Sequence, residues 1–164
     1  FQGQRPAVDV GISVSRVGGA AQLKGMKQVA GNLRLDLASY REMQSFAQFG
    51  SDLDDSTRAQ LDRGARMTEL LKQRRYASLD VADQIAVIYA GGHGFMDSLR
   101  VDQIIAFREG LVDYLQTSCD DLRNELRAGK IPDECAARLE KAIETYKARF
   151  VAARKDGAAD KAEK

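Results

Sequence analysis

The residue best placed for chemistry in this sequence is Arg16, in the segment 10–22 that reads VGISVSRVGGAAQ. Arginine is a fixed cation with a planar fork of donors, which suits the oxygens of a phosphate group. Apolar residues alternate before it and a pair of glycines follows it, so we expect a strand, a tight turn and then a helix. This layout predicts an arginine held at the end of a strand with little freedom to move.

The sequence itself offers no phosphate site to this arginine. Gly18, Gly19 and Lys24 do not have the spacing of a phosphate-binding loop. The single histidine, His93, lacks partners at metal-ligand spacing, and without a histidine base no serine triad can be assembled. The chain alone is therefore not expected to be catalytic. Arg16 then has two interpretations, a surface salt bridge or a side chain that acts on a ligand held by a neighbouring protein.

The elements that position Arg16 follow from the hydrophobic periodicity. Strand-like alternation covers residues 7–15, and a helical period begins near residue 20, is interrupted at Gly31 and resumes to about residue 47. The later apolar stripes lie at residues 81–88, 101–115 and 139–150. The pattern predicts an all-α helical bundle with a short N-terminal β-strand remnant. Because one or two strands are unstable alone, the rest of their sheet is expected to lie elsewhere.

Composition excludes several classes of partner. The 164 residues carry 25 Lys and Arg against 24 Asp and Glu, so a net charge of +1 argues for neither nucleic acid nor a membrane surface. No apolar run approaches the ~18 residues of a membrane span. Cys119 and Cys135 are interpreted as reduced thiols that pack between helices. Since the first residue is Phe1 and not Met, we expect a piece of a longer protein.

Several long runs of residues resemble the alpha subunits of the rotary F-type ATP synthases. These runs are 5–22, 26–31, 33–38, 40–42, 46–54, 68–73 and 88–91, and residues 92–150 fit mainly in pattern. The resemblance implies the end of a nucleotide-binding domain at 1–19 and a C-terminal helical domain at 20–151. Residues 152–164 have no large apolar side chain, so a disordered tail is predicted there.

The resemblance gives Arg16 a specific role. In this family the arginine of the Ser-Val-Ser-Arg turn reaches the catalytic site of the adjacent beta subunit, and an arginine supplied in trans is worth roughly 10³–10⁵ in turnover. Ser13 matches a family position required for activity, and its hydroxyl is expected either to hydrogen-bond within the turn or simply to pack. The implied protein is a regulatory, non-catalytic subunit of a proton-driven ATP synthase.

The resemblance also implies a nucleotide, ATP or ADP with Mg²⁺, that the alpha subunit binds without turning it over. The residues implied around its adenine are Arg5, Pro6, Gln73, Arg74 and Arg75. Gln73 agrees with the family, whereas Arg75 stands where a second glutamine is often found. On sequence grounds alone, Arg74 and Arg75 are charges at the C-terminal end of a helix. No cofactor is expected on this fragment by itself.

The implied partners are beta subunits on both sides, the gamma subunit of the central stalk, and the delta and peripheral stalk subunits, with no nucleic acid. Asp52 and Asp54 correspond to the region that faces the stalk, and they are interpreted equally well as helix caps. The head would lie against the inner (cytoplasmic) membrane on its cytoplasmic side, or against a mitochondrial or plastid inner membrane in a eukaryote. Two other classes stay open, a stand-alone helical interaction domain and a related export-type ATPase.

Overall fold

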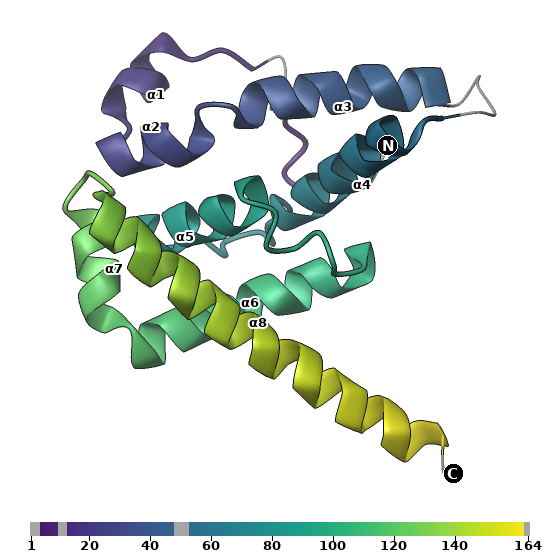
Figure 1. Cartoon of the computed structure of the whole chain (residues 1–164). Coiled ribbons are helices and arrows are strands. Elements are labelled where there is room, and N and C mark those ends of the chain that lie inside the picture. The colour runs from purple at the N-terminus through teal and green to yellow at the C-terminus, as the bar shows by residue number, and fades with distance from the viewer. Residues whose placement is uncertain (1–3, 10–12, 48–52, 163–164) are drawn as a thin grey trace.

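The regular structure of the chain is helical wherever the structure describes it. The computed structural model describes residues 4–9, 13–47 and 53–162 (Figure 1). The elements in these ranges are α1 (Arg16–Ala21), α2 (Lys24–Ala30), α3 (Leu33–Ala47), α4 (Asp55–Leu70), α5 (Val81–Gly92), η1 (Val101–Gln103), α6 (Ile104–Ser118), α7 (Asp120–Arg127) and α8 (Asp133–Ala162). The predicted all-α class is confirmed.

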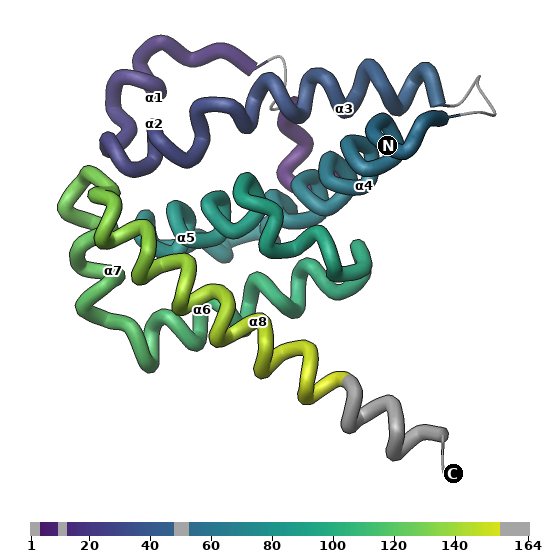
Figure 2. The backbone as a smooth tube through the Cα atoms, in the orientation of Figure 1, coloured from purple at the N-terminus to yellow at the C-terminus, as the bar shows by residue number. Residues whose placement is uncertain are grey.

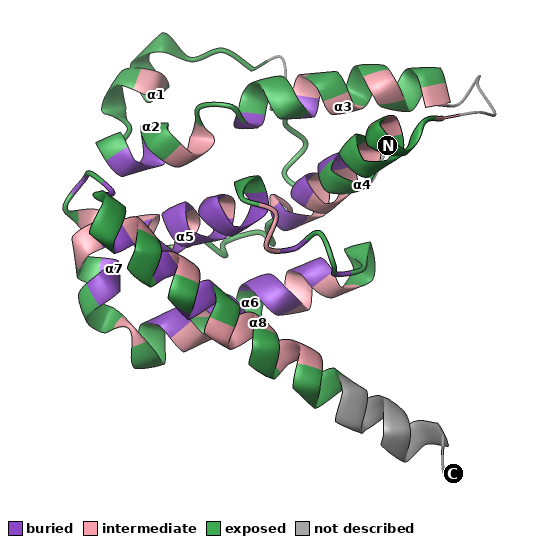
Figure 3. Cartoon of the chain, in the orientation of Figure 1, coloured by how far each residue is buried: buried purple, intermediate pink, exposed green. Residues whose placement is uncertain are grey.

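Helix α5 is the centre of the bundle. It contacts α2, α4, α6, α7 and α8, and Figure 3 shows that most of its surface is buried. Ile85 and Ala86 are fully buried. Its sequence VADQIAVIYAGG is apolar on nearly every side, as expected of a helix that other helices surround.

A buried ion pair joins α5 to its neighbours. The carboxylate of Asp83 is fully buried and accepts hydrogen bonds from Arg123 of α7, at 2.8 Å from Nε and 3.0 Å from Nη2. Gln116 of α6 donates a third bond at 2.9 Å. The carboxylate raises the pKa of Arg123 above its ordinary value, mainly through these hydrogen bonds. The pair therefore specifies how three helices meet.

Helices α3 and α4 form an antiparallel hairpin (Figure 2). A Cβ added at Gly64 would lie 2.3 Å from the ring of Tyr40, so the two helices approach closely only because this position is glycine. Asp54 caps α4 by accepting a hydrogen bond from Thr57 N at 3.3 Å. The cap interpretation of Asp54 is confirmed, while Asp52 lies outside the described residues.

The stripe predicted for the last helix is confirmed. Leu139 and Ile143 are fully buried, and the rings of Tyr146 and Phe150 lie 5.2 and 5.3 Å from the ring of Phe107 on α6. No helix in the described ranges combines the length and apolar character that crossing a membrane requires.

The disordered tail predicted for residues 152–164 stays a prediction. The structure continues helix α8 to Ala162, within that segment. Ala, Lys and Glu are strong helix formers, and a helix that already exists extends without a new nucleation step. The division of the chain at residues 19 and 20 stays a prediction.

The N-terminal prediction needs a correction. Residues 7–9 and 13–15 form no strand, and residues 10–12 lie outside the described ranges. A strand needs a neighbouring strand to satisfy its backbone, and the described part of the chain contains none. The helix expected over 20–30 is instead two helices, because α1 begins at Arg16 and Gln22 takes an extended conformation at its end.

The two cysteines pack between helices as predicted. Cys135 is buried in the core and Cys119, at the junction of α6 and α7, is half-buried; both are free. Burial raises the pKa of the Cys135 thiol. Neither thiol therefore suggests a reactive site.

Candidate functional site: an exposed arginine and a cationic hollow

Arg16 is the first residue of α1, and its side chain is exposed. Within the described residues it makes no ion pair and no side-chain hydrogen bond. The surface-salt-bridge interpretation therefore finds no partner in the part of the chain that the structure describes.

The backbone beneath Arg16 is held by a helix cap. Ser15 has an extended conformation (φ −135°, ψ 108°), and its hydroxyl accepts a hydrogen bond from Gly18 N at 2.9 Å. Gly19 N donates to Ser15 O at 3.0 Å. A Cβ at Gly18 would lie 2.8 Å from Ser15 Oγ, so the cap depends on this glycine. Such caps contribute about 1 kcal/mol, and this one fixes the direction in which Arg16 leaves the helix.

Ser13 is joined to the preceding segment through its backbone. Its backbone N donates to Asp9 O at 2.9 Å, and the hydroxyl makes no hydrogen bond to a described residue. Asp9 in turn forms an ion pair with Arg41, which ties this segment to α3. The serine whose hydroxyl caps the described part of the turn is Ser15, which the sequence patterns above did not single out, while the role of Ser13 stays a prediction. A serine directly before a helical run is an N-cap signal that would have identified Ser15.

The five residues predicted to surround a base come together in one hollow. A surface cavity of about 590 Å³ is lined by all five, although the two segments are 67 to 70 positions apart in the sequence: Arg5, Pro6, Gln73, Arg74 and Arg75. Gln73 N donates to Arg5 O at 2.9 Å and joins the two walls. This volume lies in the range of about 300–1,000 Å³ typical of small-molecule sites.

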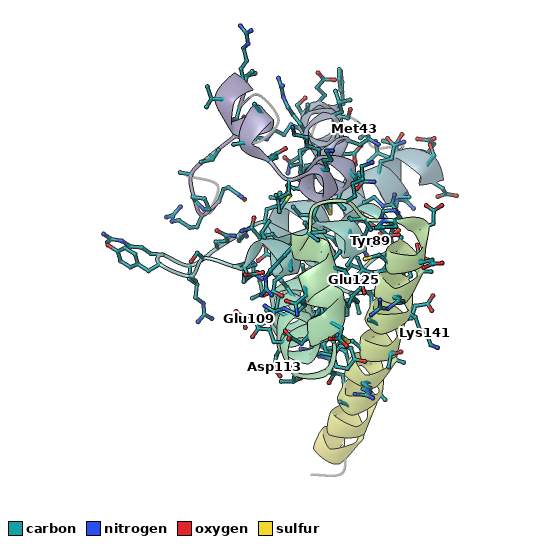
Figure 4. The ribbon with its side chains drawn as sticks, turned by 90° about the vertical axis from the view of Figure 1, so that its left-hand side faces the viewer. Met43, Tyr89, Glu109, Asp113, Glu125 and Lys141 are labelled. Atoms are coloured by element: carbon teal, nitrogen blue, oxygen red, sulfur yellow. The ribbon has the colours of Figure 1, made fainter. Side chains whose placement is uncertain are left out.

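Arg108 lies at the floor of the hollow, and no pattern in the sequence indicated this position. Arg108 is only 7% exposed, and its side chain donates to Leu70 O at 3.0 Å and to Lys72 O, so it caps the C-terminal end of α4. Glu109, which Figure 4 labels, is exposed and lies 3.8 Å from the Arg108 guanidinium. Burial lowers the pKa of Arg108, which stays far above neutrality as for any arginine. Its partners are more than 30 positions away, beyond the reach of any local pattern.

Arg75 and Tyr76 form a pair at the rim. Arg75 Nη2 donates to the Tyr76 hydroxyl at 2.8 Å, and the guanidinium lies 4.7 Å from the centre of the ring, in cation–π geometry. Tyr76 has a left-handed backbone (φ 61°) and is 88% exposed. Such a conformation is strained for a bulky residue and often marks a functional segment.

The hollow is strongly positive. Its cationic lining residues are Arg5, Lys72, Arg74, Arg75 and Arg108. Glu69 is the acidic residue among the lining residues, and it is engaged by Lys72 Nζ at 2.5 Å. An anionic or acceptor-rich ligand is therefore favoured here.

Comparison with known proteins identifies the class. The family described as ATP synthase alpha/beta chain, C terminal domain, matches residues 22–146, and the chain belongs to this family. An ATP synthase subunit alpha from Ligilactobacillus salivarius (strain UCC118) is 51% identical over 156 residues, which are 94% of this chain and 31% of that protein. Another from Wolinella succinogenes is 52% identical over 151 residues, which are 92% of this chain and 30% of that protein.

These relatives confirm the resemblance to the C-terminal portion of alpha subunits. The chain spans about a third of the length of the curated relatives it matches. The family match begins after Arg16 and after the Arg5-Pro6 wall of the hollow. The roles of these residues therefore depend on the alpha-subunit relatives and on the geometry described above.

Proposed function

We propose that this chain works as the C-terminal part of an ATP synthase alpha subunit and supplies Arg16 to the catalytic site of an adjacent beta subunit. The observation that carries the proposal is the exposed Arg16 side chain, without a described partner, on a backbone fixed by Ser15. A cation at a helix N-terminus faces the positive end of the helix dipole. Helix stability therefore does not explain the position of Arg16, which supports a role towards a ligand outside the chain.

The chemistry requires such a group. During phosphoryl transfer, charge spreads over the terminal phosphate oxygens, and the planar fork of an arginine can contact two of them. The expected contribution of roughly 10³–10⁵ in turnover corresponds to about 4–7 kcal/mol. Because Arg16 would act across an interface, a small rotation of that interface withdraws it. The alpha subunit would thereby regulate catalysis without performing it, and the fragment alone would be inactive.

The hollow is proposed to contact the base of a nucleotide, ATP or ADP with Mg²⁺, that is bound but not turned over. Convergence of Arg5, Pro6 and Gln73 on one cavity of about 590 Å³ supports this role. The phosphates and Mg²⁺ would be held by residues outside this chain, since it carries no phosphate-binding loop.

The proposed partners are beta subunits on both sides, the gamma subunit of the central stalk, and the delta and peripheral stalk subunits. The α3–α4 hairpin would point its tip at the gamma subunit, and part of that tip, residues 48–52, lies outside the described residues. The assembled head is proposed to be peripheral to the membrane that holds the rotor.

The test is an assembled complex that carries Arg16→Ala or Arg16→Lys. Both variants should lower steady-state ATP turnover by at least 10³-fold while nucleotide binding at the beta site stays nearly unchanged. Arg100→Ala is the matched control, because Arg100 is also exposed but pairs locally with Asp102 at 2.6 Å. Turnover of Arg16→Ala equal to that of the control would exclude the proposed role.

A further inference from the structure

Helix α1, which carries Arg16, is not anchored in the core. None of its six residues is buried, and residues 13–18 are all exposed. The Ser15 cap fixes the direction in which Arg16 leaves α1, but this cap is a contact within the turn. The position of the turn relative to the bundle therefore depends on contacts with other elements.

On its C-terminal side the turn is joined to α2. Lys27 Nζ donates to Ala20 O at 3.4 Å, and α2 packs on α5 with Gly25 and Met26 buried. This hydrogen bond is long, and it lies at the end of α1 opposite to Arg16. The N-terminal side of the turn, where Arg16 and its cap lie, needs a contact of its own.

Asp9 makes a contact on that side. It lies seven positions before Arg16, and its carboxylate forms an ion pair with Arg41 of α3. The carbonyl of Asp9 accepts a hydrogen bond from Ser13 N at 2.9 Å. One residue thus contacts α3 through its side chain and the start of the turn through its backbone.

Helix α3 is a fixed part of the bundle. Leu33 and Leu37 are buried, and α3 lies along α4 (Figure 2). Arg41 belongs to the exposed side of this helix, with 43% of its side chain accessible. The pair with Asp9 therefore joins a weakly packed segment to a helix that the core holds in place.

We propose that the Asp9–Arg41 ion pair positions Arg16 for its contact with the phosphoryl group in the adjacent beta subunit. Arg16 is the group that touches the ligand, and Asp9 and Arg41 are positioning residues. This inference rests on the role proposed for Arg16 above. Because ion pairs between exposed side chains contribute little to stability, loss of this pair should leave the fold intact and lower catalysis.

The expected loss is smaller than that of deleting Arg16. A misplacement of about 1 Å costs roughly 10²-fold in rate, whereas removal of an arginine finger costs roughly 10³–10⁵. Loss of the pair should therefore lower ATP turnover by roughly 10- to 100-fold. Nucleotide binding at the beta site should stay nearly unchanged, because Arg16 acts in the transition state.

The experiment measures hydrolysis of radiolabelled ATP by the assembled complex with Asp9→Asn, Arg41→Gln or both. Each single variant should show the expected loss. The double variant should lose no more than either single variant, since all three remove the same ion pair. Arg138→Gln is the matched control, because Arg138 forms a pair of similar exposure with Glu125, between α7 and α8. The control should turn over ATP as fast as wild type.

An Arg16→Ala background separates positioning from a general structural effect. If the pair acts through Arg16, adding Asp9→Asn to Arg16→Ala should cause no further loss of turnover. A general structural effect would lower turnover by the same factor in both backgrounds. Urea unfolding of Asp9→Asn and Arg41→Gln should give midpoints equal to that of Arg138→Gln.

The outcomes separate the two proposals. Wild-type turnover in either single variant, a double variant that multiplies the two losses, or an equal further loss in the Arg16→Ala background would overturn the positioning role alone. Unfolding midpoints well below that of the control would assign the pair to stability, which also overturns this role. Wild-type turnover in Arg16→Ala would overturn the role of Arg16 itself, and this inference with it.

Discussion

Removal of the Asp83 carboxylate should destabilise the chain more than any surface change. Asp83→Ala deletes three hydrogen bonds of 2.8, 2.9 and 3.0 Å and leaves the Arg123 side chain, 10% exposed, with Asp120 at 3.4 Å as its remaining carboxylate. Loss of one partner of a buried pair costs about 3–5 kcal/mol. Since small domains are stable by only about 5–15 kcal/mol, a large part of the free energy of unfolding would be lost.

The assay is urea unfolding of the chain, followed by circular dichroism at 222 nm. The midpoint should fall while the slope stays constant, because the surface exposed on unfolding is unchanged. The paired variant Asp83→Leu with Arg123→Met removes both charges and should recover most of the lost stability. A cost below about 1 kcal/mol for Asp83→Ala, or a paired variant as unstable as the single one, would refute the reasoning.

Two further predictions concern helix contacts. Gly64→Ala should cost about 1–3 kcal/mol in urea unfolding because its Cβ would meet the ring of Tyr40, whereas Gly92→Ala, with open space around its Cβ, should cost nothing. Equal changes in the free energy of unfolding for Gly64→Ala and Gly92→Ala would exclude the close approach of α3 and α4. Asp80 caps α5 and pairs with Arg127 at 3.0 Å, and this pairing lowers its pKa. Because the pKa of Asp80 is lower in the folded chain than in the unfolded chain, Asp80 stabilises the fold above about pH 4, and this contribution is lost as the pH falls further. The difference in stability between wild type and Asp80→Asn should therefore shrink from pH 7 to pH 3, and a constant difference would contradict it.

Hydrophobic periodicity predicted the features of the fold that depend only on residues close together in the sequence. The stripe that includes Leu139 and Ile143 could be found from a 3.6-residue period, because burying one face of a helix needs no knowledge of its partner. The strand predicted over residues 7–15 is not found at residues 7–9 or 13–15, because a strand depends on a neighbouring strand and the described residues provide none. Arg108 and Asp83 could not be found at all, since their partners lie more than 30 positions away and only the fold brings them together.

Part of the candidate site was also predicted from the sequence, and part was found only in the structure. Family resemblance predicted the five residues of the base region, and the structure places all of them around one hollow. The support beneath them, from Arg108, and the cap beneath Arg16, from Ser15, came from the structure. The cap was within reach of sequence rules, because serine directly before a helix is a recognised signal.

The most direct measurement for the central claim compares ground-state and transition-state binding in the assembled complex. ADP with fluoroaluminate mimics the phosphoryl group in transfer, and a group that acts only in the transition state affects this analogue and not ADP alone. Arg16→Ala should bind ADP at the beta site within a fewfold of wild type and lose tight inhibition by ADP–fluoroaluminate by roughly 10³-fold or more. Equal inhibition of wild type and Arg16→Ala would show that Arg16 does not act on the transferring phosphoryl group.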